Sequence, residues 1–155
     1  SKLANFAGPG GTITREAVEQ MVGLSREEKA WVLQEPIAAG NSDAAIHKLH
    51  ELMDISRQPE ELMIWAITDL TRKLHGTARM LRDGSGPGAA RKAMKLWGPA
   101  GDAVLDAAQR LSPQQAADLL NTAVEADRRR KSGFGKPMRS LETLTCLVAD
   151  TIGRS

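Results

Sequence analysis

The chain has 155 residues, of which 41% are hydrophobic and 26% are charged, so it has room for one domain with a real hydrophobic core. No apolar run approaches the roughly 20 residues that cross a bilayer, so we expect no membrane span, and a net charge of +2 is too small to indicate nucleic-acid binding by itself. Strand-favouring aromatic residues are scarce whereas Ala, Leu, Arg and Glu are plentiful, which predicts an all-helical fold.

The single cysteine, Cys146, cannot form an internal disulfide. It lies in an apolar helical pattern, which is typical of a small buried thiol. No signal peptide is visible, and a reducing compartment fits this cysteine usage. We therefore expect a cytoplasmic protein, and because the chain begins with Ser rather than Met, we expect it to be a piece of something longer.

The first segment, residues 1–11, combines a short apolar patch with a Gly-Pro-Gly-Gly break. This pattern is typical of the end of one helix followed by a loop. Thr12 or Thr14 is then placed to cap a short helix that ends before Gly23.

Ser25 and Glu28 form a capping-box signature at the start of the next helix, which continues through Leu33. Pro36 lacks an N–H and clashes with the preceding turn of a helix. We therefore expect a kink or a break between Leu33 and Ile37.

A cap at Asn41 or Ser42 begins a helix over 43–53, and Gly40 before it predicts a helical hairpin. Pro59 then begins the most regular helix of the chain, whose apolar positions keep helical phase for about six turns. These positions are Met63, Ala66, Ile67, Leu70, Leu74, Ala78 and Leu81. We expect this helix to be central to the bundle.

Residues 84–88 are a Gly-rich break, after which 89–97 predict a short basic helix that contains Arg91 and Lys92. A further Gly-Pro break precedes a helix over 100–111.

Ser112 followed by Pro113 begins a long helix, which ends with the cations of 128–131 and a Gly133 stop. Pro137 opens the last helix, whose apolar positions share one face. They are Leu141, Leu144, Val148 and Ile152. The chain as a whole predicts a compact all-α bundle of about six to eight helices.

A long helix carrying Ala-Asp near its end, then Lys-Ser-Gly, a short loop and a helix beginning Leu-Glu-x-Leu resembles the end of the delta subunit of the bacterial DNA polymerase III clamp loader. The matching residues are Ala126, Asp127, Lys131, Ser132, Gly133, Leu141, Glu142 and Leu144. The resemblance extends to the segment that ends the family's ATPase-like lid domain. The residues that match there are Gly11, Ile13, Thr14, Val18, Glu19, Val22 and Gly23. Trp31, Ile37 and Gly40 also fit the family, whereas 34–36 and the Gly-rich linker 84–88 depart from it.

The resemblance implies that residues 1–23 are the remnant of a lid domain, that 24–152 form a helical collar domain, and that 153–155 are a frayed tail. Five such collars, from delta, delta-prime and three motor subunits, close into a ring in that family. The resemblance implies partners in those motor subunits and delta-prime, contact with the sliding clamp only through an N-terminal domain outside this chain, and contact with DNA only through the complex. It implies no enzymatic activity for this part, since delta does not hydrolyse ATP.

The residues themselves argue against an active site. None of the glycine clusters has the spacing of a phosphate-binding loop, and no Ser/His/Asp or Cys/His set is recognisable. His47, His50 and Glu51 would share one helix edge and could ligate a metal if His75 came close, but two neutral surface histidines explain them more simply. We therefore expect no catalytic residue, cofactor or metal.

The basic run over 128–131 has three interpretations: a helix end turned to solvent, contact with an acidic surface of a partner subunit, or contact with DNA phosphates. The first predicts that replacing Arg129 and Arg130 with Gln leaves the melting temperature nearly unchanged. The alternative to a collar is a free-standing helical DNA-binding module, and a helical enzyme of unknown chemistry is a third hypothesis. The possible partner or DNA contacts are Arg91, Lys92, Arg128, Arg129 and Arg130. A contiguous basic stripe across two helices would favour DNA.

Overall fold

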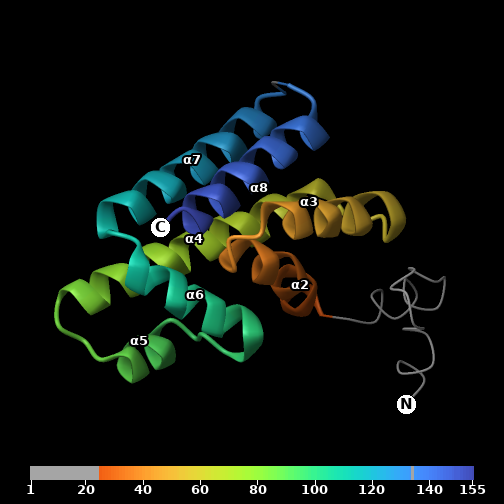
Figure 1. Cartoon of the computed structure of the whole chain (residues 1–155). Helices are drawn as coiled ribbons and strands as arrows, with labels where there is room; N and C mark the ends of the chain where they lie inside the picture. The colour runs from red at the N-terminus through yellow and green to blue at the C-terminus, as the bar shows by residue number, and fades with distance from the viewer. Residues whose placement is uncertain (1–24, 134) are drawn as a thin grey trace, which may run out of the picture.

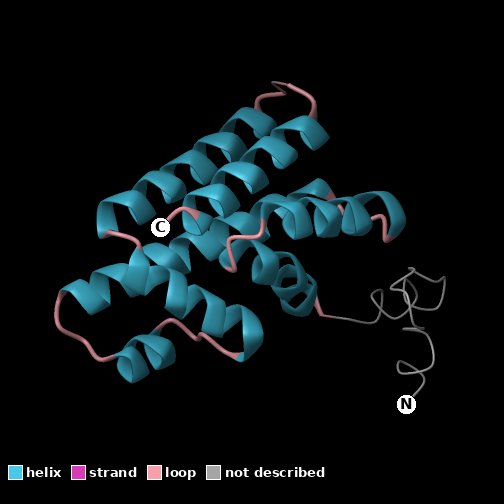
Figure 2. Cartoon of the chain, viewed as in Figure 1, coloured by secondary structure: helices cyan, strands magenta, loops and turns pink. Residues whose placement is uncertain are grey.

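A computed structural model describes residues 25–133 and 135–155 (Figure 1). The helices are α2 (Arg26–Ala38), α3 (Ser42–His50), α4 (Glu60–Arg82), α5 (Pro87–Ala93), α6 (Gly98–Arg110), α7 (Pro113–Lys131) and α8 (Pro137–Gly153), and a π-helical turn, η1 (Glu51–Ile55), continues α3. Figure 2 shows only helices and loops in this part of the chain. The predicted all-α bundle of six to eight helices is confirmed, while the helix expected before Gly23 lies outside the described residues.

Side-chain caps begin the helices where the sequence predicts them. Ser25 Oγ accepts a hydrogen bond from the Glu28 N–H at 3.1 Å at the start of α2. At the start of α7, Ser112 Oγ accepts from the Gln115 N–H at 3.1 Å, and Gln115 Oε1 accepts from the Ser112 N–H at 2.9 Å. This second pair is a complete capping box, so two otherwise unpaired amides of α7 are satisfied.

Pro36 does not break α2, which continues to Ala38. Of the kink or break expected there, the break does not occur: α2 runs two residues past Pro36, although Pro36 has no N–H to donate to the Val32 carbonyl one turn earlier. The carbonyl of Pro36 accepts from the Asn41 N–H at 3.1 Å, and Leu33 and Ile37 on either side are fully buried. Burial of this face outweighs the local cost of the proline.

The helix predicted over 43–53 changes form before its end. Regular α3 stops at His50, and the chain continues as the wider turn η1 to Ile55. The Ser56 N–H donates to the Glu51 carbonyl at 2.9 Å, which closes this turn. Leu49 and Leu52 are both fully buried, so the apolar face that the pattern predicts is preserved.

Helix α4 is the centre of the bundle, as the sequence predicts. It packs most extensively on α7, and it also contacts α2, α5, α6 and α8. Its apolar face is buried from Met63 to Ala78, and Leu81 is half-buried. The fully buried α4 side chains are those of Met63, Ala66, Ile67, Leu70, Thr71, Leu74 and Thr77.

Two glycines bring the α2–α3 turn against the end of α8. Gly40 has φ of +75°, and a Cβ there would lie 2.7 Å from the Gly153 Cα. No real Cβ tolerates so short a contact with backbone, and a residue with a Cβ would also be strained at this φ. Gly40 therefore forms the predicted hairpin turn and the close approach to α8 together.

Candidate interaction surfaces

The residues of the Ala-Asp and Lys-Ser-Gly motif end α7. Asp127 accepts from Lys131 Nζ at 2.8 Å and from Arg130 Nη2 at 3.2 Å. These bonds, chiefly the one from Lys131, hold the pKa of the Asp127 carboxyl below its usual range. Asp127 thus stabilises the last turn of the helix, where cations are favoured by the helix dipole.

The Ser132–Gly133 pair is a helix stop. Gly133 has φ of +79°, and its N–H donates to the Arg130 carbonyl at 3.0 Å. Ser132 Oγ donates to the Arg128 carbonyl at 3.1 Å. The stop predicted at Gly133 is confirmed, and the hydrogen bonds satisfy carbonyls that the helix end would leave unpaired.

On α8, the motif residues Leu141 and Leu144 are buried, whereas Glu142 joins α8 to α3. Glu142 Oε2 lies 3.2 Å from His50 Nε2, and His50 Nδ1 lies 3.4 Å from Asp54 Oδ2. The motif residues on α7 therefore stabilise the end of that helix, and the motif residues on α8 attach α8 to the rest of the bundle.

The basic run over 128–131 is not uniformly turned to solvent. The side chain of Arg130 is only 19% exposed, and its Nη1 lies 3.5 Å from carboxylate oxygens of both Glu60 and Glu61. The interpretation of a solvent-facing run is wrong for Arg130, because α7 places it beside the acidic first turn of α4. Arg128 is exposed and pairs with Glu125, its Nε donating to Oε2 at 2.9 Å.

The basic pair on α5 is separate from this run. Arg91 Nη1 donates to Asp102 Oδ1 at 2.6 Å and to the Leu96 carbonyl at 3.1 Å, so it fastens the α5–α6 turn. Lys92 is exposed. Figure 1 places α5 at the lower end of the molecule and the C-terminal end of α7 at the upper end. The two basic clusters therefore do not form a contiguous stripe.

A groove of about 530 Å³ lies between the outer sides of α7 and α8. We call it the α7–α8 groove; it is lined by Asn121, Thr122, Glu125, Ala126, Arg129, Gly135, Lys136, Arg139, Ser140, Thr143, Leu144 and Leu147. Leu147 is 41% exposed in it. The sequence pattern singled out Arg129 but not Lys136 and Arg139, since these two stand beyond the helix stop and outside any run of like charges.

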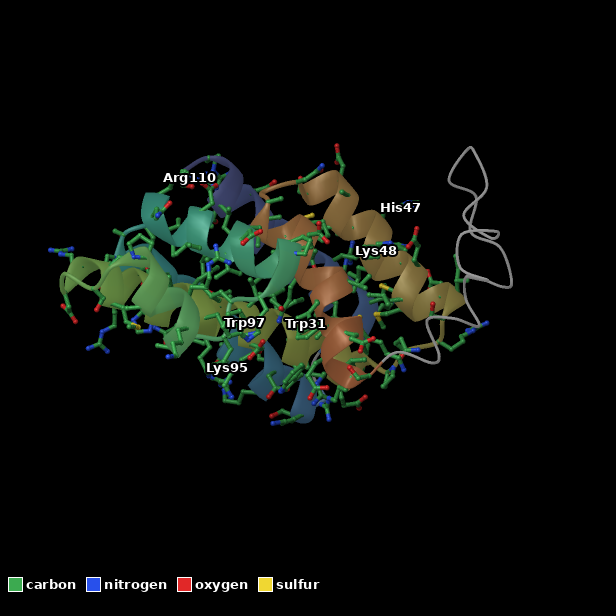
Figure 3. All side chains as sticks on the ribbon, turned by 90° about the horizontal axis from the view of Figure 1, so that it is seen from below. Trp31, His47, Lys48, Lys95, Trp97 and Arg110 are labelled. Atoms are coloured by element: carbon green, nitrogen blue, oxygen red, sulfur yellow. The ribbon has the colours of Figure 1, made fainter. Side chains whose placement is uncertain are left out.

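A second surface exposes two tryptophans. Trp31 on α2 is 41% exposed and Trp97 before α6 is 55% exposed, and both border one small hollow with Lys95. Figure 3 shows these three residues together on one side of the molecule. We call Trp31, Lys95 and Trp97 the tryptophan patch. The sequence contains these residues but gives no sign of their proximity.

A buried polar contact lies beside the tryptophan patch. Gln34, fully buried beside it, donates to the Ala66 carbonyl at 2.9 Å and to Asp69 Oδ2 at 3.0 Å. These bonds join α2 to α4. Gln34, one of the residues 34–36 that depart from the delta-subunit pattern, therefore has a structural role.

The histidines considered as metal ligands pair with carboxylates. His47 Nε2 lies 2.8 Å from Glu51 Oε1, and His50 lies between Asp54 and Glu142. Over 25–133 and 135–155, no three His, Cys, Asp or Glu side chains are placed to hold a metal ion.

Cys146 is half-buried rather than fully buried. Burial raises the pKa of its thiol, and the carboxylates of Asp150, Glu142 and Asp43 add to this effect. The thiol is therefore held in its unreactive protonated form.

Within the described part of the chain, no helix has the length and apolar character required to cross a membrane. Comparison of the chain with protein-family models, with curated proteins and with solved structures finds no match in any of the three.

Proposed function

We propose that residues 24–152 are the collar domain of a delta-like subunit of a DNA polymerase III clamp loader, which acts in DNA replication in the cytoplasm. In this proposal the domain is a scaffold. It holds the loader together while other domains place the sliding clamp on DNA, and its own partners are the collars of the motor subunits and of delta-prime. Residues 1–23 would then be the end of the lid domain, and they lie outside the described residues.

The observation that supports this proposal best is the α7–α8 hairpin. The motif residues lie on both of its arms, and they cap α7, pair with its last turn or pack α8 into the core. The inner side of the hairpin is buried on α4 and α3, while its outer side forms an open groove. A rigid element that is open on one side is what an assembly domain needs, since a preformed surface loses little conformational entropy on binding.

A collar in a ring must present two different surfaces, because each subunit meets its two neighbours head to tail. The α7–α8 groove and the tryptophan patch meet this requirement. They share no helix: the groove is built from α7 and α8, and the patch from α2 and the segment between α5 and α6. Exposed Trp and Arg side chains are the residue types that most often dominate protein–protein binding energy.

We propose no catalysis for this domain. Phosphate binding requires clustered backbone amides with a lysine, and the sequence has no segment of that kind. ATP hydrolysis and polymerisation would belong to other subunits of the holoenzyme.

The test is to mix the chain with separately purified motor and delta-prime collars of the same organism and to measure sedimentation velocity. We expect a five-collar assembly, with weak isolated pairs, because avidity accrues only in the closed ring. If no complex forms at high micromolar concentration, and the chain shifts the mobility of duplex DNA in moderate salt, the collar proposal fails. The DNA-binding module then takes its place.

A further inference from the structure

The cations around the end of α7 differ in whether they have acidic partners. Arg128, Arg130 and Lys131, which do not line the α7–α8 groove, each pair with a carboxylate of α7 or α4. The cations that do line the groove are Arg129, Lys136 and Arg139, and within the described residues none of them makes an ion pair. Among the cations around the end of α7, the ones without a carboxylate partner are therefore those that line the groove.

The acidic complement of the groove is small. Its one lining carboxylate within the described residues is Glu125, and that side chain is held by both Nε and Nη2 of Arg128. Three cations thus face a single carboxylate that is already paired. Charges arranged in this way attract and orient a partner of opposite sign.

Part of the groove lining is apolar. It comprises Ala126, Leu144 and Leu147, of which Leu144 is buried and Leu147 is 41% exposed on a helix whose other face is buried. An apolar lining accompanied by cations suits a partner segment that is apolar on one face and acidic on its flanks. It suits a nucleic-acid strand poorly, since the described lining residues include no aromatic ring on which a base could stack.

The length of the groove points to a short helix. At about 1.5 Å per residue, the positions 136–147 that border it on the α8 side extend roughly 16 Å, which is about three helical turns. An amphipathic helix of this length presents apolar residues at i, i+3, i+4 and i+7 to one groove.

We propose that the α7–α8 groove binds an acidic amphipathic helix of a neighbouring subunit in the ring. Its apolar face contacts exposed Leu147 and half-buried Ala126, and its flanking carboxylates pair with Arg129 and Arg139. This inference rests on the proposed collar function and adds to it which surface binds and what chemistry the partner has.

Charge reversal is the first test. The variant Arg129→Glu/Arg139→Glu is compared with the control Arg79→Glu/Arg82→Glu, which changes net charge equally at exposed arginines of α4 outside the groove. We expect the groove variant to weaken assembly with the sister collars at least tenfold and to reduce its dependence on salt. The control assembles as the unchanged chain does. Circular dichroism and thermal melting establish that both variants are folded.

A second variant and a cross-link identify the occupant. Leu147→Asp places a negative charge in the apolar part of the groove lining, and we expect it to weaken assembly as the charge reversal does. A photo-cross-linking amino acid at exposed Thr143 in the groove should join to an acidic helical segment of one sister collar. The same probe at exposed His47 of α3 should not reach that segment.

The outcomes separate this inference from the proposed function. If the unchanged chain assembles and the groove variants assemble within twofold of it, the groove inference fails and the collar stands. Cross-linking of Thr143 to a basic or non-helical segment, or competition by duplex DNA for the groove, also overturns the inference. If the unchanged chain does not assemble at all, the collar fails and the groove inference fails with it.

Discussion

The two sides of α8 differ in how their residues are held. On the inner side, Leu141, Val148 and Ile152 are buried, and Gly153 touches the backbone of Gly40. On the outer side, Arg139, Thr143 and Leu147 face solvent in the α7–α8 groove. The same helix thus stabilises the fold through one side and leaves the other free for a partner. Substitutions on the two sides should therefore affect different measurements.

The largest expected effect is on the buried side of the bundle. Leu70→Ala should lower the free energy of unfolding by about 2 to 5 kcal/mol, because Leu70 is fully buried mid-helix and its loss leaves a cavity. Leu147→Ala in the groove should change it by less than about 0.5 kcal/mol, as exposed positions usually do. Urea unfolding measures both. A loss below about half a kcal/mol for Leu70→Ala would mean that this face of α4 is not core.

Gly40→Ala should be next, at roughly 2 to 4 kcal/mol, because it adds left-handed backbone strain to a clash with Gly153. Gly84→Ala is the matched control. Gly84 also has positive φ, +97°, but a Cβ there meets nothing within 4 Å, so only the backbone strain remains. Thermal melting of the two variants compares them. Equal losses of stability in the two variants would show that the contact between the α2–α3 turn and α8 does not contribute to stability.

Arg130→Gln should lower the free energy of unfolding by about 1 kcal/mol, because the side chain is largely buried among three carboxylates. Arg129→Gln should lower it by less than about 0.5 kcal/mol, since Arg129 is exposed. If the partner binds in the α7–α8 groove, Arg129→Gln should weaken assembly and Arg130→Gln should not. Weakening by both variants would mean that both arginines contact a partner. Denaturation and sedimentation of the same two samples separate the roles.

The smallest expected effect depends on pH. The pKa of Asp127 is lowered in the folded state, so the pairing of its carboxylate stabilises the fold above about pH 4, the ordinary carboxyl range. This stabilisation is lost as the pH falls through the pKa of the folded state. Asp127→Asn should remove the effect. The stability difference between the two proteins, less than about 1 kcal/mol near neutral pH, should shrink toward pH 2. A difference that grows on acidification would contradict the assigned direction.

What the sequence predicts well here depends on neighbours in the chain. Ser112 and Gly133 begin and end α7 as predicted, because capping and left-handed termination involve residues within one turn of each other. The apolar face of α4 was predictable for a similar reason, since the 3.6-residue period of a helix decides which side chains share a face. The motif residues on α7 and α8 were found in the same way, as short local patterns.

What the tertiary structure decided concerns residues whose partners are distant in the chain. Arg130 looked like its neighbours in the basic run, and only the packing of α7 on α4 brought it to Glu60. Trp31 and Trp97 share one patch because α2 and α6 pack together. Where a helix starts and ends is set by steric and hydrogen-bonding interactions over a few residues. The pairing of a charge or the exposure of an aromatic ring depends instead on which helices meet. That is decided by the burial of apolar surface across the whole core.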